Sequence, residues 1–371
     1  MRLKRTGPSN VEIHSDFDRG SIGALTETKP GHFVGPTKHW IKAAGIGNQY
    51  YWFCFRLDGV AGRTLTIVLT DLEGLYRGEP HEVYTNSTQP VVSYDQETWS
   101  RITNVRYDPA GHTFQFTHRY DRNTAWVAYA HPYPLAKKEA YLLSIAGSRH
   151  VRIEPLGSSR EGRPIELVTI TDFSTGDEGK KVVFVTGLVH AGEDCSGYFV
   201  QGMIDYLLSD EPKALEAGKK TIFKIVPMVN PDGMYRGISR YTAEMEDASA
   251  QWSQADPVAE VACVKNWLAD WLAAKPIDVV IDVHSHGQVN PQNIAYVPAD
   301  ILSGFVNGLA KHWPVSRSVH AFSGSLAEHA YNQKGIPAIT LELTQSHIGD
   351  GNYLDIGDYL SYGAATVKAM I

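Results

Sequence analysis

Hydrophobic and polar residues alternate in short runs along the first third of the chain. Examples are YYWFCFRL (50–57), TLTIVLTDL (64–72) and TAWVAYAHPY (124–133), and residues such as Gly, Asp, Asn and Pro separate the runs. A period of two is typical of a strand with one buried face, and these separating residues favour turns. Residues 1–135 are therefore predicted to form an N-terminal antiparallel β-sandwich domain.

From about residue 140 the pattern changes to continuous apolar runs that alternate with longer helical segments. The apolar runs are VVFVTGLV (182–189), FKIVPMVN (223–230), DVVIDVHS (278–285) and AITLELT (338–344), and helices are expected at 196–208 and 257–274. Strands that are apolar throughout are typical of a sheet covered by helices on both faces. Residues 136–371 are therefore predicted to form an α/β domain.

Size, composition and charge narrow the class of protein. A chain of 371 residues exceeds the size at which one core usually keeps growing, so two domains are expected. The net charge is −7 and the Lys and Arg residues are scattered, which argues against a nucleic-acid or anionic membrane surface. These features favour a small or peptide-like substrate.

Three cysteines without CxxC spacing suggest neither a disulfide framework nor a cysteine zinc site. The N-terminus has no apolar signal segment, and no apolar run reaches 18 residues. We therefore expect a cytoplasmic protein.

Polar residues lie where the predicted strands end. HAGE (190–193) follows the first apolar run, His284 ends the third, and Glu342 lies late in the fourth. In open α/β sheets, ligands bind at the carboxyl ends of the strands. A catalytic zinc needs about three His or carboxylate ligands and one open position, which His190, Glu193 and His284 can supply. A lone HxxE also occurs by chance, so the motif alone does not establish the site.

Glu342 stands between Leu341 and Leu343 in an otherwise apolar strand. Burying an uncompensated carboxylate costs several kcal/mol, roughly, so Glu342 should face a metal, a partner or a polar cleft. The alternative is that Glu342 lies on the exposed face of an edge strand.

Asp282 points to the same face as His284 and is a candidate acceptor for its imidazole. Arg240 either reaches a reacting centre or is solvated.

In order along the chain, these motifs resemble the zinc carboxypeptidase family, and within it the cytosolic carboxypeptidase subgroup with an N-terminal β-sandwich. The resemblance covers nearly the whole chain. It is carried by SDFDRGSI (15–22), WVAYAHPYP (126–134), LGSSREGRPIELVTI (156–170), HAGE (similar to HPGE), NPDGMYRGISR (230–240) and DVHSHG (282–287, similar to DLHGHS).

The resemblance implies a mixed central sheet flanked by helices, and one Zn²⁺ per chain held by His190, Glu193 and His284. It also implies that Glu342, in TLEL, is the general base and acid. Arg240 matches the arginine that polarises the scissile carbonyl and steadies the oxyanion.

The sequence departs from the family where an Asn and an Arg usually grip the substrate's terminal carboxylate. An ungapped alignment places Ser249 and Ala250 at those positions. Neither residue replaces a bidentate arginine fork. His320 falls where a tyrosine often closes over the substrate, so Ser249, Ala250 and His320 are the candidate substrate-binding residues.

Three hypotheses remain open. Other cations bind the carboxylate, the candidates being Arg160, Arg163, Arg236, His320 and His347; or the substrate lacks that carboxylate, as for a deacylase, amidase or esterase acting on an acylated or sugar-derived compound; or the chain is a non-catalytic binding protein. The leading hypothesis is zinc-dependent cleavage of an amide bond in a peptide-like substrate. In it, the front domain shapes the cleft or docks a protein partner.

Overall fold

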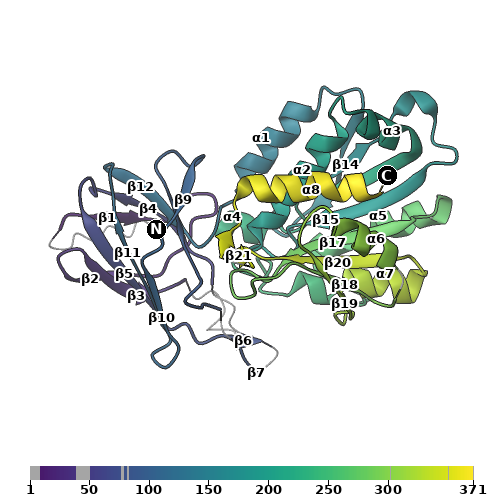
Figure 1. Ribbon diagram of the computed structural model, residues 1–371. Helices are drawn as coiled ribbons and strands as arrows, with labels where there is room; N and C mark the ends of the chain where they lie inside the picture. The colour runs from purple at the N-terminus through teal and green to yellow at the C-terminus, as the bar shows by residue number, and fades with distance from the viewer. Residues whose placement is uncertain are drawn as a thin grey trace.

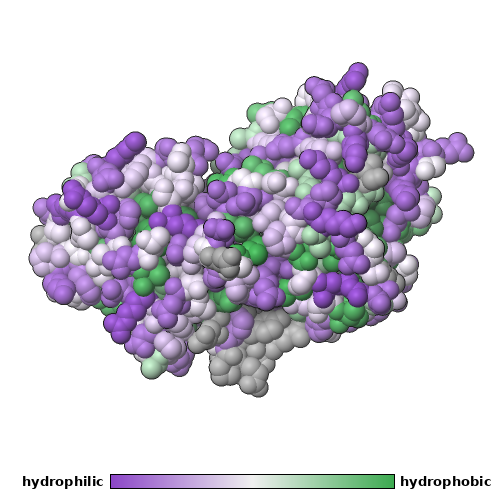
Figure 2. All heavy atoms as spheres, in the orientation of Figure 1, coloured by the Kyte–Doolittle hydropathy of each residue, from purple (hydrophilic) through white to green (hydrophobic). Residues whose placement is uncertain are grey.

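The computed structural model describes residues 9–38, 51–76, 79–81, 83–300, 302–349 and 351–370. Residues 1–8 and 39–50 of the predicted front domain, including the first residue of the run at 50–57, lie outside these ranges. Two parts lie side by side, a strand-rich N-terminal part and a larger part built from a sheet and helices (Figure 1). Hydrophilic residues cover most of the face seen in Figure 2, and the hydrophobic ones form small scattered groups.

In its described residues, the N-terminal part contains two five-stranded sheets that enclose one hydrophobic core. One sheet has the order β1 (Glu12–His14), β4 (Cys54–Asp58), β12 (Thr124–Ala128), β8 (Val91–Ser93) and β9 (Trp99–Arg101). The other has the order β10 (Val105–Asp108), β11 (Thr113–Arg119), β5 (Thr64–Thr70), β3 (His32–Pro36) and β2 (Thr26–Lys29). The short strands β6 (Leu75–Tyr76) and β7 (Glu79–Pro80) pair with each other.

The alternation in β5 has the predicted consequence. Leu65, Ile67 and Leu69 are fully buried, while Thr66 and Val68 between them are not. One strand pair departs from the antiparallel prediction, because β3 and β5 run parallel. The chain between them passes through β4 in the other sheet, and such a long crossover allows a parallel pair.

The larger part is built on one eight-stranded mixed sheet. Its order is β13 (Val151–Ser158), β14 (Pro164–Ile170), β16 (Thr221–Val226), β15 (Lys181–Gly187), β17 (Val279–Ser285), β20 (Ala338–Leu343), β18 (Ile294–Val297) and β19 (Ser316–Val319). The pairs from β16 through β15 and β17 to β20 are parallel, and β18 is antiparallel to β20. The predicted metal ligands and Glu342 lie at or just beyond the carboxyl ends of β15, β17 and β20.

Helices cover both faces of this sheet. One core cluster joins the sheet to α1 (Leu135–Ile145), α2 (Asp194–Leu207), α3 (Pro212–Lys220), α4 (Pro231–Arg236), α6 (Ser303–Leu309) and α8 (Ile356–Met370). The cluster on the opposite face joins it to α5 (Ala259–Ala274) and α7 (Leu326–Lys334). No helix in the described ranges is both long and apolar enough to cross a lipid bilayer.

The alternation of side chains across the sheet decides where the polar residues point. Leu341 and Leu343 belong to the cluster under α2 and α8. Because neighbouring side chains in a strand point to opposite faces, Glu342 projects to the other side. His284 is the Cα partner of Glu342 in the adjacent strand and shares that side.

Two glycines bring α2 and α8 into close contact. A methyl group on Gly363 would overlap the backbone carbonyl oxygen of Phe199, and one on Gly202 would overlap the backbone of Leu360. Helix α2 begins directly after the predicted metal ligand Glu193. The close packing against α8 therefore fixes the position of the helix end next to this ligand.

Replacing Gly363 with alanine should lower the free energy of unfolding by about 1–3 kcal/mol, since the added methyl group overpacks the helix contact. Urea denaturation measures the change. The control is Gly304→Ala in α6, where an added methyl group meets nothing within 4 Å. That control should leave stability unchanged or raise it by up to about 1 kcal/mol. Equal stability of the Gly363→Ala protein and its parent would contradict the prediction.

Candidate metal centre

The loop between β15 and α2 carries two of the predicted ligands, His190 and Glu193. Its backbone turns sharply at Leu188, which has a φ of 51°. Gly192 lies so close to the Tyr51 ring and the Ser239 carbonyl that any side chain there would collide with them. The Ser196 hydroxyl donates to the Glu193 carbonyl oxygen at 2.8 Å and fixes the end of the loop.

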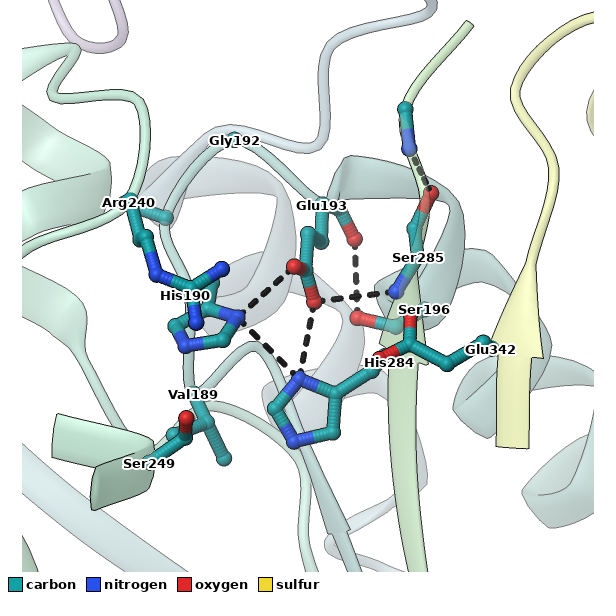
Figure 3. A network of polar contacts seen from close by, with 12 residues as sticks. Val189, His190, Gly192, Glu193, Ser196, Arg240, Ser249, His284, Ser285 and Glu342 are labelled. Atoms are coloured by element: carbon teal, nitrogen blue, oxygen red, sulfur yellow. Dashed lines mark hydrogen bonds and ion pairs between the residues drawn. The ribbon is translucent and has the colours of Figure 1, made fainter. Parts of the chain in front are cut away.

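The structure brings the three predicted metal ligands together. One ligand atom from each of His190, Glu193 and His284 lies within 4.8 Å of the others. Glu193 Oε1 is 2.7 Å from His190 Nδ1, and its Oε2 is 3.0 Å from His284 Nδ1 (Figure 3). The side chains are at most 4% exposed. Two imidazoles and one carboxylate that converge in this way form a donor set suited to catalytic zinc.

Each of the two imidazoles also contacts an aspartate through its Nε2 atom. Asp247 Oδ1 is 3.1 Å from His190 Nε2, and Asp282 Oδ2 is 3.1 Å from His284 Nε2. Asp282 is in turn fixed by the Thr186 hydroxyl at 2.6 Å. Such partners orient ligand imidazoles, so both rings present Nδ1 to the shared point.

The electrostatics of the site favour a positive charge at its centre. Burial lowers the pKa of His284, but the carboxylates of Asp282 and Glu193 outweigh burial and raise its pKa well above the usual value. Burial and Arg240 lower the pKa of His190, yet the neighbouring carboxylates again leave it raised. Burial raises the pKa of Glu193, but the two imidazoles hold it well below its usual value.

Glu342 lies beside this cluster, as Figure 3 shows. Burial raises the pKa of its carboxyl group, and the charge of Glu193 acts in the same direction. His286 Nδ1 is 3.9 Å from Glu342 Oε2. Strand β20 therefore places the carboxyl group of Glu342, which has a raised affinity for a proton, next to the candidate metal ligands.

A cavity of about 280 Å³ opens over these residues. The N-terminal part contributes Tyr51, His81, Val83 and Tyr129 to its wall. The larger part contributes the three candidate ligands and residues that include Arg240, Ser249, Ala250, Ser285, His286, Tyr296, Phe322, Thr340 and Glu342. The structure thus places seven of the eight predicted site residues around one space.

Arg240 and Ser249 are both tied to Asp247. The Arg240 Nε donates to Asp247 Oδ2 at 2.9 Å, and the Ser249 backbone N–H and hydroxyl each donate to Oδ1 at 3.1 Å. Ala250 ends the short 3₁₀ helix Ala248–Ala250, and its carbonyl oxygen contacts Gly324 closely. Asp247 therefore links the candidate oxyanion residue, a candidate metal ligand and the Ser249–Ala250 segment.

His320, the eighth predicted residue, does not line the cavity. It is exposed, and its ring packs 6.0 Å from Tyr296 and 4.8 Å from Phe322, which do line it. The other cations proposed to bind a carboxylate are not among the described lining residues either. Arg160 pairs with Glu244, Arg163 with Glu161 and Asp232, and Arg236 with Glu161, while His347 contacts Ser346.

Sequence reasoning missed Tyr51, Tyr129 and Tyr296 as parts of the cavity wall. Tyr51 and Tyr129 lie in the N-terminal part, and their approach to His190 depends on how the two parts pack together. No local pattern reports that packing. Asp247 had a usable signal, because it lies two residues before Ser249, in the segment where the sequence departs from the family.

Two family profiles match the chain and together cover most of it. The zinc carboxypeptidase profile matches residues 139–271, and the profile of the cytosolic carboxypeptidase N-terminal domain matches residues 13–130.

Curated relatives include "Cytosolic carboxypeptidase 6" of Homo sapiens, 32% identical over 256 residues, which are 63% of this chain and 50% of that protein. The protein of the same name from Mus musculus is 30% identical over 253 residues, or 63% and 46% of the two chains. The chain spans about half the length of these relatives.

Solved structures share the fold over nearly the whole chain. A metallo-carboxypeptidase from Burkholderia cenocepacia superposes with a TM-score of 0.81 at 22% identity and 97% coverage of both chains. A metallo-carboxypeptidase from Pseudomonas aeruginosa gives 0.79 at 21% identity, with 97% of this chain and 98% of that one covered. With the two matching profiles, the chain contains a zinc carboxypeptidase domain preceded by a cytosolic carboxypeptidase N-terminal domain.

Proposed function

We propose that the chain is a zinc-dependent hydrolase that cleaves an amide bond in a peptide-like substrate. One Zn²⁺ is held by His190, Glu193 and His284, with Glu342 as general base and Arg240 as the group that steadies the oxyanion. The observation that carries the proposal is the convergence of the three ligand atoms within 4.8 Å, beside Glu342, whose side chain is 13% exposed.

Zinc in a site with an open position polarises a carbonyl oxygen and lowers the pKa of a water molecule toward ~7. Glu342 takes the proton of the attacking water and passes it to the leaving nitrogen, a role suited to a carboxyl group whose pKa is raised. Arg240 lines the same cavity, and its positive charge opposes the charge that develops on the carbonyl oxygen. Asp247 holds the Arg240 side chain in place.

The cavity also bears on which bond is cut. Among the described residues that line it, Arg240 is the one arginine and there is no lysine. Arg240 is already bound to Asp247 through Nε, and the Ser249–Ala250 segment presents no charge. This segment therefore offers no guanidinium group that could bind the free terminal carboxylate of a peptide. The absence supports an atypical substrate specificity.

The neutral segment favours a second candidate, a deacylase, amidase or esterase whose substrate lacks that carboxylate. The aromatic side chains of Tyr296 and Phe322 line the same cavity and provide apolar contact area for an acyl or ring group.

A panel of substrates distinguishes the two candidate functions. Peptides with free and with amidated C-termini are compared with N-acyl compounds and esters, with zinc content measured in parallel. Cleavage that depends on a free C-terminus favours the first candidate.

The Ala250→Arg variant probes the missing clamp. If the absent fork explains the specificity, this variant should raise kcat/KM for peptides with a free C-terminus at least tenfold, which corresponds to about 1.4 kcal/mol. The control is Ala250→Met, which adds similar bulk without charge. An equal change in both variants, or none in either, would mean that the cavity recognises its substrate without a fork at this position.

We further propose that the chain divides into domains at residue 135, where α1 begins. The front domain supplies Tyr51, Val83 and Tyr129 to the cavity wall, which supports a role in shaping the cleft. Docking of a protein partner by the front domain is a separate proposal, tested by binding assays with the full chain.

The substrate panel also tests the third hypothesis. If the chain binds zinc but cleaves no member of the panel, it is a non-catalytic binding protein.

A further inference from the structure

We propose that Arg19, in the front domain, is a positioning residue that holds the metal-binding loop 190–194 in the shape the cation requires. This inference rests on the proposed zinc site. Arg19 lies in the turn between β1 and β2, about 170 residues away in sequence from the loop that it contacts. Its side chain is 1% exposed, so it lies inside the contact between the two parts of the molecule.

The guanidinium of Arg19 forms a bidentate ion pair with Asp194. Nε donates to Oδ1 at 3.0 Å and Nη2 donates to Oδ2 at 2.6 Å. Asp194 is fully buried, directly follows Glu193 and is the first residue of α2. Its Oδ1 also accepts from the Tyr133 backbone N–H at 2.7 Å. A two-pronged pair of this kind fixes orientation as well as distance.

The same guanidinium also binds backbone carbonyl groups. Nη2 donates to the Ala191 carbonyl oxygen, and Nη1 donates to that of Ile238 at 3.3 Å. Ala191 and Asp194 lie on either side of Glu193, so one side chain holds the loop at two points around a candidate ligand. Ile238 lies two residues before Arg240. Arg19 therefore joins the loop that carries His190 and Glu193 to the segment that precedes Arg240.

Contacts within the front domain fix Arg19 itself. Its guanidinium carbon lies 3.6 Å from the centre of the Trp52 ring, and Trp52 Nε1 donates to the Arg19 carbonyl oxygen at 3.1 Å. The Trp52 backbone N–H donates to the Ser239 hydroxyl at 2.9 Å, which extends the same contact to the segment before Arg240. These contacts anchor Arg19, and through it the loop 190–194, to the front domain.

Metal sites tolerate little displacement of their ligands, and loss of supporting contacts typically weakens metal binding about 10–100-fold. Lysine at position 19 keeps the charge but cannot form the fork and the two carbonyl contacts together. Asparagine at position 194 keeps the shape of the side chain and removes its charge. Arg19→Lys and Asp194→Asn should therefore each weaken zinc binding by about this factor.

The test uses the full chain and zinc alone as the ligand, with affinity measured by competition against a chelator. The double variant should lose little more than the worse single variant, because both changes break one interaction. Excess zinc should restore much of the lost activity. The control is Lys138→Gln, which breaks a buried ion pair with Glu166 whose residues do not line the cavity. It should lower the melting temperature and leave zinc affinity unchanged.

Three results would overturn the inference. Zinc affinity equal to the parent's in both single variants, with the parent binding zinc, would leave the proposed function standing and remove the role of Arg19. An equal loss of affinity in Lys138→Gln would show an effect of stability alone. A parent protein without zinc affinity would overturn the proposed function, and this inference with it.

If Arg19→Lys does not fold, Arg19→Gly replaces it, because the φ of 73° at this position suits glycine. Added methylguanidinium should then occupy the vacated space over Trp52 and raise the zinc affinity of the glycine variant. No rise, with the variant folded, would contradict the role assigned to the guanidinium.

Discussion

Replacing Glu342 with glutamine should lower kcat by about 10²–10⁴-fold and leave zinc binding intact. Glutamine keeps the shape of the side chain but cannot accept the proton of the attacking water. The surroundings of Glu342 support this role, because burial and the charge of Glu193 raise its pKa and so increase its affinity for a proton. An effect on kcat larger than that on KM is expected, since the proton transfer belongs to the chemical step.

Steady-state kinetics on a substrate that the parent protein cleaves, together with metal analysis of both proteins, measure the effect. A suitable control is Glu216→Gln, an exposed glutamate in α3 that pairs with Lys220. This change should leave kcat and zinc content unchanged. Turnover that survives the loss of Glu342 would rule out the mechanism proposed here, even if the family and the metal site are correct.

Local patterns predicted the strands that carry the site. The apolar runs at 182–189, 278–285 and 338–344 became β15, β17 and β20, and the residues at their carboxyl ends meet at one edge of the sheet. The convergence of His190, Glu193 and His284 follows from this register. It could be expected from the sequence because the position of each ligand depends mainly on the strand before it.

Contacts between the two parts of the chain could not be predicted in the same way. Arg19 and Asp194 each resemble an ordinary surface charge in the sequence, and only the packing of the two parts buries them together. The parallel pairing of β3 and β5 is a similar case, since alternation defines a strand but not the direction of its neighbour. The uncharged residues Ser249 and Ala250 could be read from the sequence, whereas the wall formed by Tyr51 and Tyr129 required the tertiary structure.

The second large effect should follow loss of a ligand. His284→Gln should abolish zinc binding at ordinary concentrations and reduce turnover to background, because two protein ligands rarely hold a catalytic zinc. The parent should be stabilised by zinc, by about 4 kcal/mol when free zinc is 1,000 times its Kd, since a cation bound only by the folded state shifts the unfolding equilibrium. Thermal unfolding with and without zinc, and after treatment with a chelator, measures this response.

Together, the two variants separate the roles of metal and base. Both should lose activity, but Glu342→Gln should keep the rise in melting temperature with zinc, whereas His284→Gln should lose it. This contrast arises because Glu342 is not one of the three residues whose ligand atoms converge. An undiminished zinc response in His284→Gln would place the cation at another site, and a lost response in Glu342→Gln would make Glu342 a ligand rather than a base.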